Sequence, residues 1–248
     1  MVSNDVTGLT PGQGCHAAML TVKGKLLGDL RIYSMGETPE AGLLIELSRA
    51  CAEKVKDDLE RHLIMDDALI TDVSADLGHL GVYGEAAAQI LGGRGGGGDG
   101  ASELAPYHYR RLDEESHPDG PLAGMPRLFA ARSVELGIPG YHVFGPPDAL
   151  ATLDAEVKKS GGHALTDAEF DALRIEAGTP IYGAELEEDR MPAEANLDDA
   201  VSFSKGCYLG QEVVVRLRDR GHLNRRLCGV RFPDWPAATP PPVRGTRL

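Results

Sequence analysis

The sequence predicts an α+β fold, in which strands and helices are mixed along the chain without regular alternation. Leu43 to Leu47 is an apolar run of strand length, and apolar residues recur every four residues after Ser48, which predicts an amphipathic helix. Strand-like segments then follow one another directly at 68–73 and 77–83. A doubly wound parallel sheet would need a helix between them, so this order favours α+β.

The next elements extend the same mixed order. We expect a short helix at 85–91, strands at 127–134 and 141–144, and a helix entered through Pro146 that buries Leu150, Leu153 and Val157. The clearest helix begins at Thr166, because Thr166 and Glu169 form a capping box, and it ends at Gly178. Further along, Gln211 and Glu212 open a β-branched run, which predicts a strand carrying the arginines Arg216, Arg218 and Arg220.

Composition describes an ordinary globular chain with an acidic balance. Its 248 residues are 42% hydrophobic and 25% charged, with a net charge of −13. This charge excludes a generally basic, nucleic-acid-binding surface. From Lys205 to Leu248, nine Lys or Arg face three acidic residues, net +6, so a local anion-facing site near this end remains possible beside an ordinary solvated strand.

The cysteines and the hydropathy pattern indicate in which cellular compartment the protein is expected. Cys15, Cys51, Cys207 and Cys228 show no zinc spacing and no CxxC pair, which disfavours a disulfide framework or structural metal. His142, His163 and His222 likewise have no ligand spacing, so the sequence assigns no metal. No stretch reaches the length of a membrane span, and the N-terminus is not a signal peptide. We expect a cytoplasmic protein without membrane or stable nucleic-acid partners.

The segment Lys205-Gly-Cys-Tyr-Leu-Gly-Gln-Glu212 is unusual on physical grounds. Two glycines flank a thiol and an aromatic ring, and they permit a close approach of backbone and ligand. Lys205 would favour the thiolate form of Cys207 if the two side chains were neighbours. The alternative is that Cys207 is a small hydrophobic residue in a glycine-rich turn.

This segment, together with the preceding LRIEAG and the following RGHLNRR, resembles the signature of folate-binding YgfZ-type proteins, relatives of the aminomethyltransferase (T-protein) of glycine cleavage. Near the N-terminus, residues 4–9 (NDVTGL) and 23–30 (KGKLLGDL) are similar to the family's NDV and KGxxxxDL segments. Arg132-Ser133, with Gly137, Gly140 and Tyr141, is similar to its RTxxxGxxGY stretch. The three motifs occur in the family's order.

The resemblance implies two related α+β lobes that enclose a tetrahydrofolate pocket, followed by a small C-terminal β-barrel. We expect the first lobe at 1–80 and 165–230, and the second at 81–164 with a glycine-rich insertion at 92–100. Residues 231–248 would begin the barrel. By the same resemblance, we expect the chain to be truncated at both ends.

Three positions depart from the T-protein pattern. The first acid of the T-protein's GGxxDDL segment is matched by Gly28, which leaves only Asp29, and two further acids are matched by Ile138 and His142. A carboxylate beside the reacting nitrogen is needed for proton movement, so these departures argue against glycine cleavage. We therefore expect Gly28→Asp to be the substitution that would restore activity, and an acid supplied by Asp29 or Asp5 would favour the transferase.

The resemblance favours the YgfZ branch, which implies a tetrahydrofolate-dependent role in assembling or repairing iron-sulfur enzymes, with an influence on tRNA modification. Reduced folate and client iron-sulfur proteins are the expected partners. Cys207 would act as nucleophile or transient iron ligand, assisted by Lys205. The candidate folate-binding residues are Asn4, Asp5, Tyr83, Arg132, Glu176, Tyr208, Gly210, Gln211, Glu212 and Arg216.

Two other functions stay open on the sequence alone. The first is a folate-dependent aminomethyltransferase. The second is a noncatalytic RNA-associated protein that uses the basic C-terminal end, which the acidic remainder of the chain disfavours.

Overall fold

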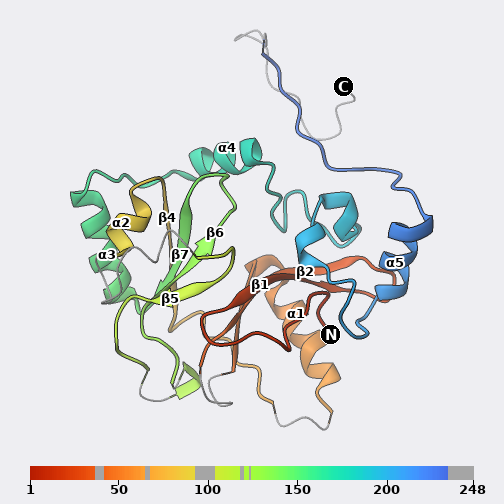
Figure 1. The fold of residues 1–248 in the computed structure, drawn as a ribbon, viewed down its shortest axis with the longest axis horizontal. Coiled ribbons are helices and arrows are strands. Elements are labelled where there is room, and N and C mark those ends of the chain that lie inside the picture. Colours follow the sequence, from red (N-terminus) through yellow and green to blue (C-terminus); the bar gives the residue numbers. More distant parts are fainter. Residues whose placement is uncertain (37–41, 65–67, 93–103, 118–119, 123, 234–248) are drawn as a thin grey trace.

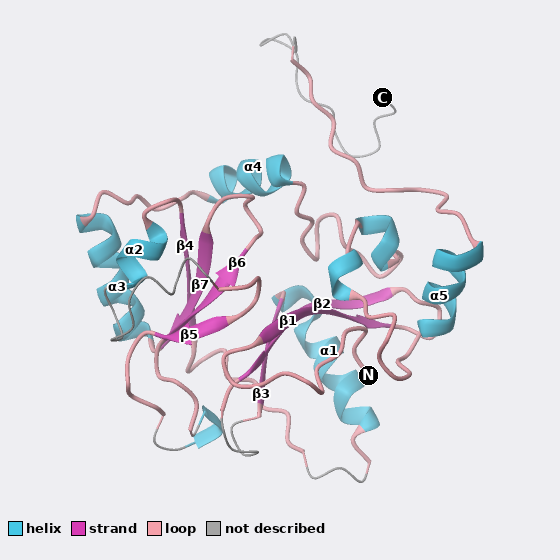
Figure 2. Ribbon diagram, in the orientation of Figure 1, coloured by secondary structure: helices cyan, strands magenta, loops and turns pink. Residues whose placement is uncertain are grey.

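The computed structural model of the protein describes residues 1–36, 42–64, 68–92, 104–117, 120–122 and 124–233. It contains two antiparallel sheets with helices on their outer faces (Figures 1 and 2). The predicted α+β class is confirmed. Most of the predicted glycine-rich insertion and of the expected barrel segment lies at 93–103 and 234–248, outside the described residues.

The first sheet has the order β1-β2-β3, with β1 at Gly14–Leu20, β2 at Leu26–Ser34 and β3 at Leu43–Leu47. One face packs on α1 (Arg49–His62), where Leu30 and Ile32 of β2 meet the helix. The stripe of α1 is the predicted one, with Cys51, Val55 and Leu59 buried, and Ser48 accepts a hydrogen bond from the amide of Ala50. Because side chains alternate along a strand, the residues of β2 next to Leu30 and Ile32 point to the other face of the sheet.

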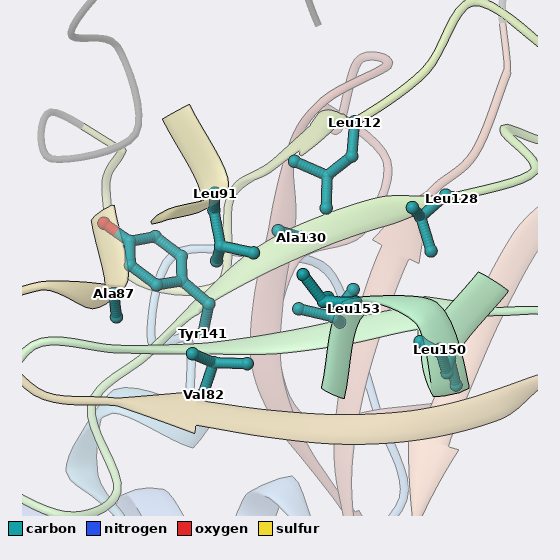
Figure 3. Close-up of a cluster of buried hydrophobic side chains, with 10 residues drawn as sticks. Val82, Ala87, Leu91, Leu112, Leu128, Ala130, Tyr141, Leu150 and Leu153 are labelled. Atoms are coloured by element: carbon teal, nitrogen blue, oxygen red, sulfur yellow. The ribbon is translucent and has the colours of Figure 1, made fainter. Parts of the chain in front are cut away.

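The second sheet has the order β4-β7-β6-β5. Its strands are β4 (Gly78–Tyr83), β5 (Tyr109–Arg111), β6 (Phe129–Ser133) and β7 (Gly140–Gly145). The helices α2 (Ala87–Gly92) and α3 (Pro147–Lys159) cover one face. Figure 3 shows Leu150 and Leu153 of α3 over this sheet, in one buried cluster with Val82, Ala130 and Tyr141.

The remaining faces of the two sheets pack against each other through aromatic rings. Tyr33 of β2 lies 5.8 Å from the ring of Phe144 on β7, and the rings of Phe129 and Phe144 stack at 5.0 Å. Leu44 of β3 joins the same buried cluster. The order of layers is therefore α1, first sheet, second sheet, then α2 with α3.

The chain after residue 160 returns from the second sheet to the first (Figure 1). α4 (Asp167–Ala177) has the predicted capping box, and Gly178 ends it in the left-handed region at φ 78°. Short 3₁₀ turns at Pro192–Ala195 and Asp198–Ala200 follow, and a third lies earlier, at Gly120–Leu122. α5 (Gln211–Arg220) is the last helix among the described residues.

Two predicted elements are wrong. No strand forms at 68–73; Ile70 packs on the α1 core while Val73 packs between the sheets, so this segment bridges two clusters as a loop. The β-branched run after Gln211 is the helix α5, because burial of Val214 beside Leu20 and Leu26 outweighs its β-propensity. The strands β1, β2 and β5 were not predicted as strands. No helix in the described part of the chain is long and apolar enough to cross a membrane.

Candidate functional site

A cavity of about 170 Å³ lies between the first sheet and the loops that follow β6 and α4. His16, Asp29 and Arg31 line it from β1 and β2, Tyr107 and Glu135 from loops, and Asp199 from the 3₁₀ turn Asp198–Ala200. In β1 and β2, His16 pairs with Arg31 and Ala18 pairs with Asp29. These side chains occupy the face of the sheet opposite α1, as the alternation of the strands requires.

A hydrogen-bonded chain of polar groups runs through this cavity. His16 Nε2 lies 2.6 Å from Asp29 Oδ1, and His16 Nδ1 lies 2.9 Å from Asp199 Oδ2. The Tyr107 hydroxyl donates to the same Asp199 oxygen at 3.0 Å. Asn4 supports the arrangement, because its side-chain amide donates to the main-chain oxygens of His16 and Asp199.

The two carboxylates change the ionisation of the histidine. Burial alone would lower the pKa of His16, but hydrogen bonds to Asp199 and Asp29 outweigh it and raise that pKa to about 9. The same contact with His16 lowers the pKa of Asp199 against the opposing effect of burial. At neutral pH the site therefore holds an imidazolium between two carboxylates.

Backbone strain is also concentrated here. Tyr107 and Asn196 have positive φ angles of 64° and 59°, and they are the non-glycine residues with this conformation in the described part of the chain. Both line the cavity. A tyrosine in the left-handed region costs free energy that the surrounding contacts must offset, and such residues are typical of functional sites.

Gly28 does not face this cavity. A Cβ added at Gly28 would lie 2.6 Å from Val55 Cγ2 and 3.6 Å from the Cys51 sulfur, both on α1. Asp29, the next residue, points to the opposite face and forms the bond to His16. Of positions 28 and 29, only position 29 faces the cavity, so a glycine at position 28 does not by itself remove a carboxylate from it.

A second charged cluster lies beside the cavity and joins the two sheets. Arg31 Nη1 lies 3.4 Å from Glu46 Oε1 on β3, and Arg31 Nη2 lies 3.3 Å from Glu135 Oε2 after β6. His142 Nε2 of β7 is 2.7 Å from Glu135 Oε1, and Tyr83 donates a hydrogen bond to the same Glu135 oxygen. Tyr83, a predicted folate ligand, therefore belongs to this cluster.

Each charge in this cluster depends on its neighbours. Burial disfavours the charged form of Glu135, yet hydrogen bonding to His142 and the charge of Arg31 lower its pKa to about 2. Burial would also lower the pKa of His142, but Glu135 and Glu46 raise it to about 9. Partial desolvation and the charge of His142 lower the pKa of the neighbouring His79 to about 4.

The KGCYLGQE segment lies elsewhere, at a cavity of about 280 Å³ on the α1 side of the first sheet. Exposed Cys207 and buried Tyr208 line it with Met19 and His62. The Tyr208 hydroxyl has no hydrogen-bond partner among the described residues. This cavity shares no lining residue with the one that contains Asp29.

Lys205 holds the N-terminal segment in place. Its ammonium donates to the main-chain oxygens of Val2 and Asn4 at 2.8 and 3.0 Å. It also lies 5.8 Å from the centre of the Tyr208 ring. No hydrogen bond joins Lys205 to Cys207 within the described residues, so its expected assistance to the thiol stays a prediction.

Gly210 requires glycine for packing. It has φ 80°, and an added Cβ would lie 2.5 Å from the Thr21 oxygen in the β1–β2 turn. Gln211 and Glu212 start α5, where exposed Glu212 pairs with exposed Arg216. These residues shape a helix start and do not line the cavity around Asp29.

Three other predicted ligands lie apart from that cavity. Asp5 is exposed and accepts hydrogen bonds from Thr7. Arg132 lies over the ring of Tyr141, at 5.5 Å, on the helix-covered face of the second sheet. Glu176 is exposed on α4, although Gly178, two residues later, lines the cavity.

Sequence reasoning missed most of the residues that the structure brings together. His16, Arg31, Tyr107, Glu135 and Asp199 come from five separate segments. The available signal was a charged residue at alternate positions of an apolar strand, as where Asp29 and Arg31 alternate with Leu30 and Ile32. Nothing in linear spacing could have paired these residues with Glu135 or Asp199.

The position of Gly28 yields a first prediction. Gly28→Asp should lower the free energy of unfolding by about 3 kcal/mol or more, because the side chain enters the contact with Val55 and buries a charge. Urea denaturation measures the effect. Gly8→Asp is the matched control, since nothing lies within 4 Å of a Cβ at Gly8. If Gly28→Asp were as stable as the parent, position 28 could not point at α1.

The ionisation of His16 yields a second prediction. Because its pKa in the folded protein is about 9 and its ordinary value is 6.5, the stabilising contribution is complete below pH 6.5 and is lost as the pH rises through 9. The stability difference between the protein and His16→Gln should therefore fall by about 3 kcal/mol from pH 6 to pH 9.5. Denaturant unfolding across this range tests it, with exposed His163→Gln as control. If the stability difference stayed constant over this pH range, His16 would not be protonated in the folded protein.

Comparison with known proteins agrees with this architecture. The chain is 31% identical over 237 residues to the aminomethyltransferase of Synechococcus elongatus and 30% identical over 230 residues to that of Rubrobacter xylanophilus. These matches cover 94% and 92% of this chain but 60% and 58% of the relatives, so the chain spans less than two thirds of their length.

The crystal structure of the glycine cleavage system aminomethyltransferase T from Bartonella henselae has the same fold, with a TM-score of 0.70 at 21% identity. The superposition covers 89% of this chain and 56% of that one. Residues 1–205 match the GCVT N-terminal domain. The resemblance to the wider superfamily is thus confirmed, and the protein belongs to the GCVT N-terminal domain family.

Proposed function

We propose that the protein binds a reduced folate, tetrahydrofolate, in the cavity around Asp29 and acts as a folate-dependent aminomethyltransferase. The observation that carries this proposal is the Asp29 carboxylate, held 2.6 Å from His16 in a cavity between the sheets. The named relatives are aminomethyltransferases, which favours this function over the YgfZ-type one.

The cavity suits the polar end of a folate. Its volume of about 170 Å³ is smaller than the 300 to 1,000 Å³ typical of sites that enclose a drug-sized ligand. It would therefore take the pterin and leave the tail outside. A pterin has an edge of N–H donors that can form two parallel hydrogen bonds to one carboxylate. Of the two carboxylates bonded to His16, Asp199 is the more exposed, at 57% of its side chain, and is therefore the better placed to bind this edge.

The residues of the hydrogen-bonded chain can handle protons. When bound, a reduced folate supplies the nitrogen atoms that take over the one-carbon unit of an aminomethyl donor, while the protons of those nitrogens pass to the departing groups. Asp29 is placed to accept a proton, because it is a carboxylate within hydrogen-bond reach of the cavity. His16 orients Asp29 and balances its charge, and Asp199 orients His16 in turn.

A YgfZ-type accessory role is the second candidate. Its support is the KGCYLGQE segment with an exposed Cys207, and the absence of acids at Ile138 and His142. In this role the protein would bind tetrahydrofolate and assist client iron-sulfur proteins through Cys207. The two candidates use different cavities, so they can be separated by substitution.

Asp29→Asn tests the transferase. We expect tetrahydrofolate binding to change less than about tenfold and transfer from an aminomethylated carrier protein to fall by about 10² to 10⁴, because the proton acceptor is lost. Calorimetry and a single-turnover assay measure the two effects. Asp198→Asn, at an exposed neighbour of Asp199, is the control. Absence of folate binding at millimolar concentration would overturn both candidates, and folate binding without transfer would favour the accessory role.

Cys207→Ala tests the accessory role. Cys207 is exposed and Cys51 is 2% exposed, so alkylating reagents should label Cys207 first. Cys207→Ala should change the free energy of unfolding by less than about 1 kcal/mol and leave folate affinity unchanged. If the accessory role is correct, it should also abolish rescue of iron-sulfur enzyme activity in cells that lack the native gene. Full rescue by Cys207→Ala would rule out the thiol as the functional group.

A further inference from the structure

Three potential metal ligands from both sheets meet next to the charged cluster. Glu46 comes from β3, His79 from β4 and His142 from β7. One ligand atom of each lies within 4.8 Å of the others, a separation that a single bound ion can bridge. The three residues are 33 and 63 positions apart along the chain, which explains why sequence spacing assigned no metal.

The side chains are oriented by their surroundings. His142 Nδ1 lies 3.2 Å from Glu46 Oε1. The ring of His79 lies 4.6 Å from the ring of His142 and stacks on Phe144, with an angle of 12° between the planes. The Tyr33 hydroxyl donates to the other oxygen of Glu46 at 2.9 Å. Packing therefore fixes the directions of these side chains before any ligand arrives.

The nitrogen of His142 that points away from Glu46 also has a carboxylate partner. His142 Nε2 lies 2.7 Å from Glu135 Oε1. A histidine that binds a metal usually donates its second ring N–H to a carboxylate or carbonyl, which fixes the tautomer and strengthens the ligand. Glu135 is in position for this role, with Nδ1 of His142 left to face Glu46 and His79.

The charge balance leaves room for a cation. Glu46 and Glu135 provide two negative charges, and Arg31 pairs with both but supplies one positive charge. Two carboxylates beside a single guanidinium make this position attractive to a metal cation. The carboxylate oxygens have several lone pairs, so Glu46 can ligate an ion and still accept from Arg31.

We propose that Glu46, His79 and His142 form a site for one divalent transition-metal ion between the two sheets, with Glu135 as the second-layer partner of His142. Two imidazoles and one carboxylate suit zinc, cobalt, nickel or ferrous iron better than magnesium or calcium. Three protein ligands leave further positions for water. None of the three ligands lines the cavity around Asp29, although Glu135 contacts both sites, so metal binding can be measured without folate.

Cobalt and zinc titrations of the metal-free protein test the site. We expect Co²⁺ to give visible d–d absorption bands without the thiolate charge-transfer band that Cys207 or Cys228 would produce. Zn²⁺ at 100 times its Kd should raise Tm by about 5 to 10 °C, because the ion binds only the folded chain and links β3 to β4 and β7. Calorimetric titration should show one more metal-binding site in the parent protein than in the His79→Ala variant.

The key variant is His79→Ala, because His79 is exposed and its loss is compatible with folding. It should weaken the Co²⁺ signal and the Zn²⁺ affinity by about 100-fold or more. His163→Ala, at an exposed histidine outside the cluster, should bind like the parent. Glu46→Gln, read by Co²⁺ absorption at a temperature where circular dichroism shows it folded, should lose the bands as well.

Either of two results would overturn the proposal. One is no Co²⁺ band and no Zn²⁺-dependent rise in Tm at millimolar metal. The other is equal binding by His79→Ala and the parent, which would place the metal on other surface groups. In both cases, the cluster is an ion-pair network in which a proton on His142 supplies the balancing charge.

Discussion

Arg31 of β2 pairs with two carboxylates, one on its own sheet and one from the loop after β6. A buried guanidinium is costly unless carboxylates pair with it, and here Glu46 of the same sheet and Glu135 from the loop after β6 do so. These contacts fix where the loop after β6 lies against β2. Since Glu135 and Arg31 both line the cavity around Asp29, the ion pair that connects this loop to β2 also defines one wall of the candidate site.

Neighbouring residues of β2 point to opposite faces of the sheet, so some of them pack on α1 and the others line the cavity. Gly28 and Leu30 face α1, while Asp29 and Arg31 face the opposite sheet and the cavity. Adjacent residues therefore have unrelated roles, and a change at position 28 affects the helix contact while a change at position 29 affects the site. Matching a family motif residue by residue cannot distinguish these roles unless it is known which face of the sheet each side chain occupies.

Much of the fold was predictable because local signals agree with the tertiary structure. Helices α1, α3 and α4 and strands β3, β4, β6 and β7 follow periodicity, caps and breakers. The prediction failed where tertiary contacts decide, as in α5, where a buried Val214 makes a β-branched run helical. The site was less predictable. Asp29 was noted from the motif, but its partner His16 is 13 residues away, and Asp199, which bonds to the other nitrogen of His16, is 170 residues from Asp29, so only folding brings them together.

The most conspicuous segment of the sequence lies apart from the polar cavity, and this separation has a physical origin. In KGCYLGQE, Gly210 accommodates the turn at Thr21, Lys205 binds the carbonyls of Val2 and Asn4, and Tyr208 fills the core beside Leu20. These contacts hold the N-terminal segment on the first sheet, and Asn4 in turn supports His16 and Asp199. The segment is therefore coupled to the cavity through Asn4, while its thiol faces a different opening. An unusual motif can act on a site by positioning a neighbour, without contributing a side chain to it.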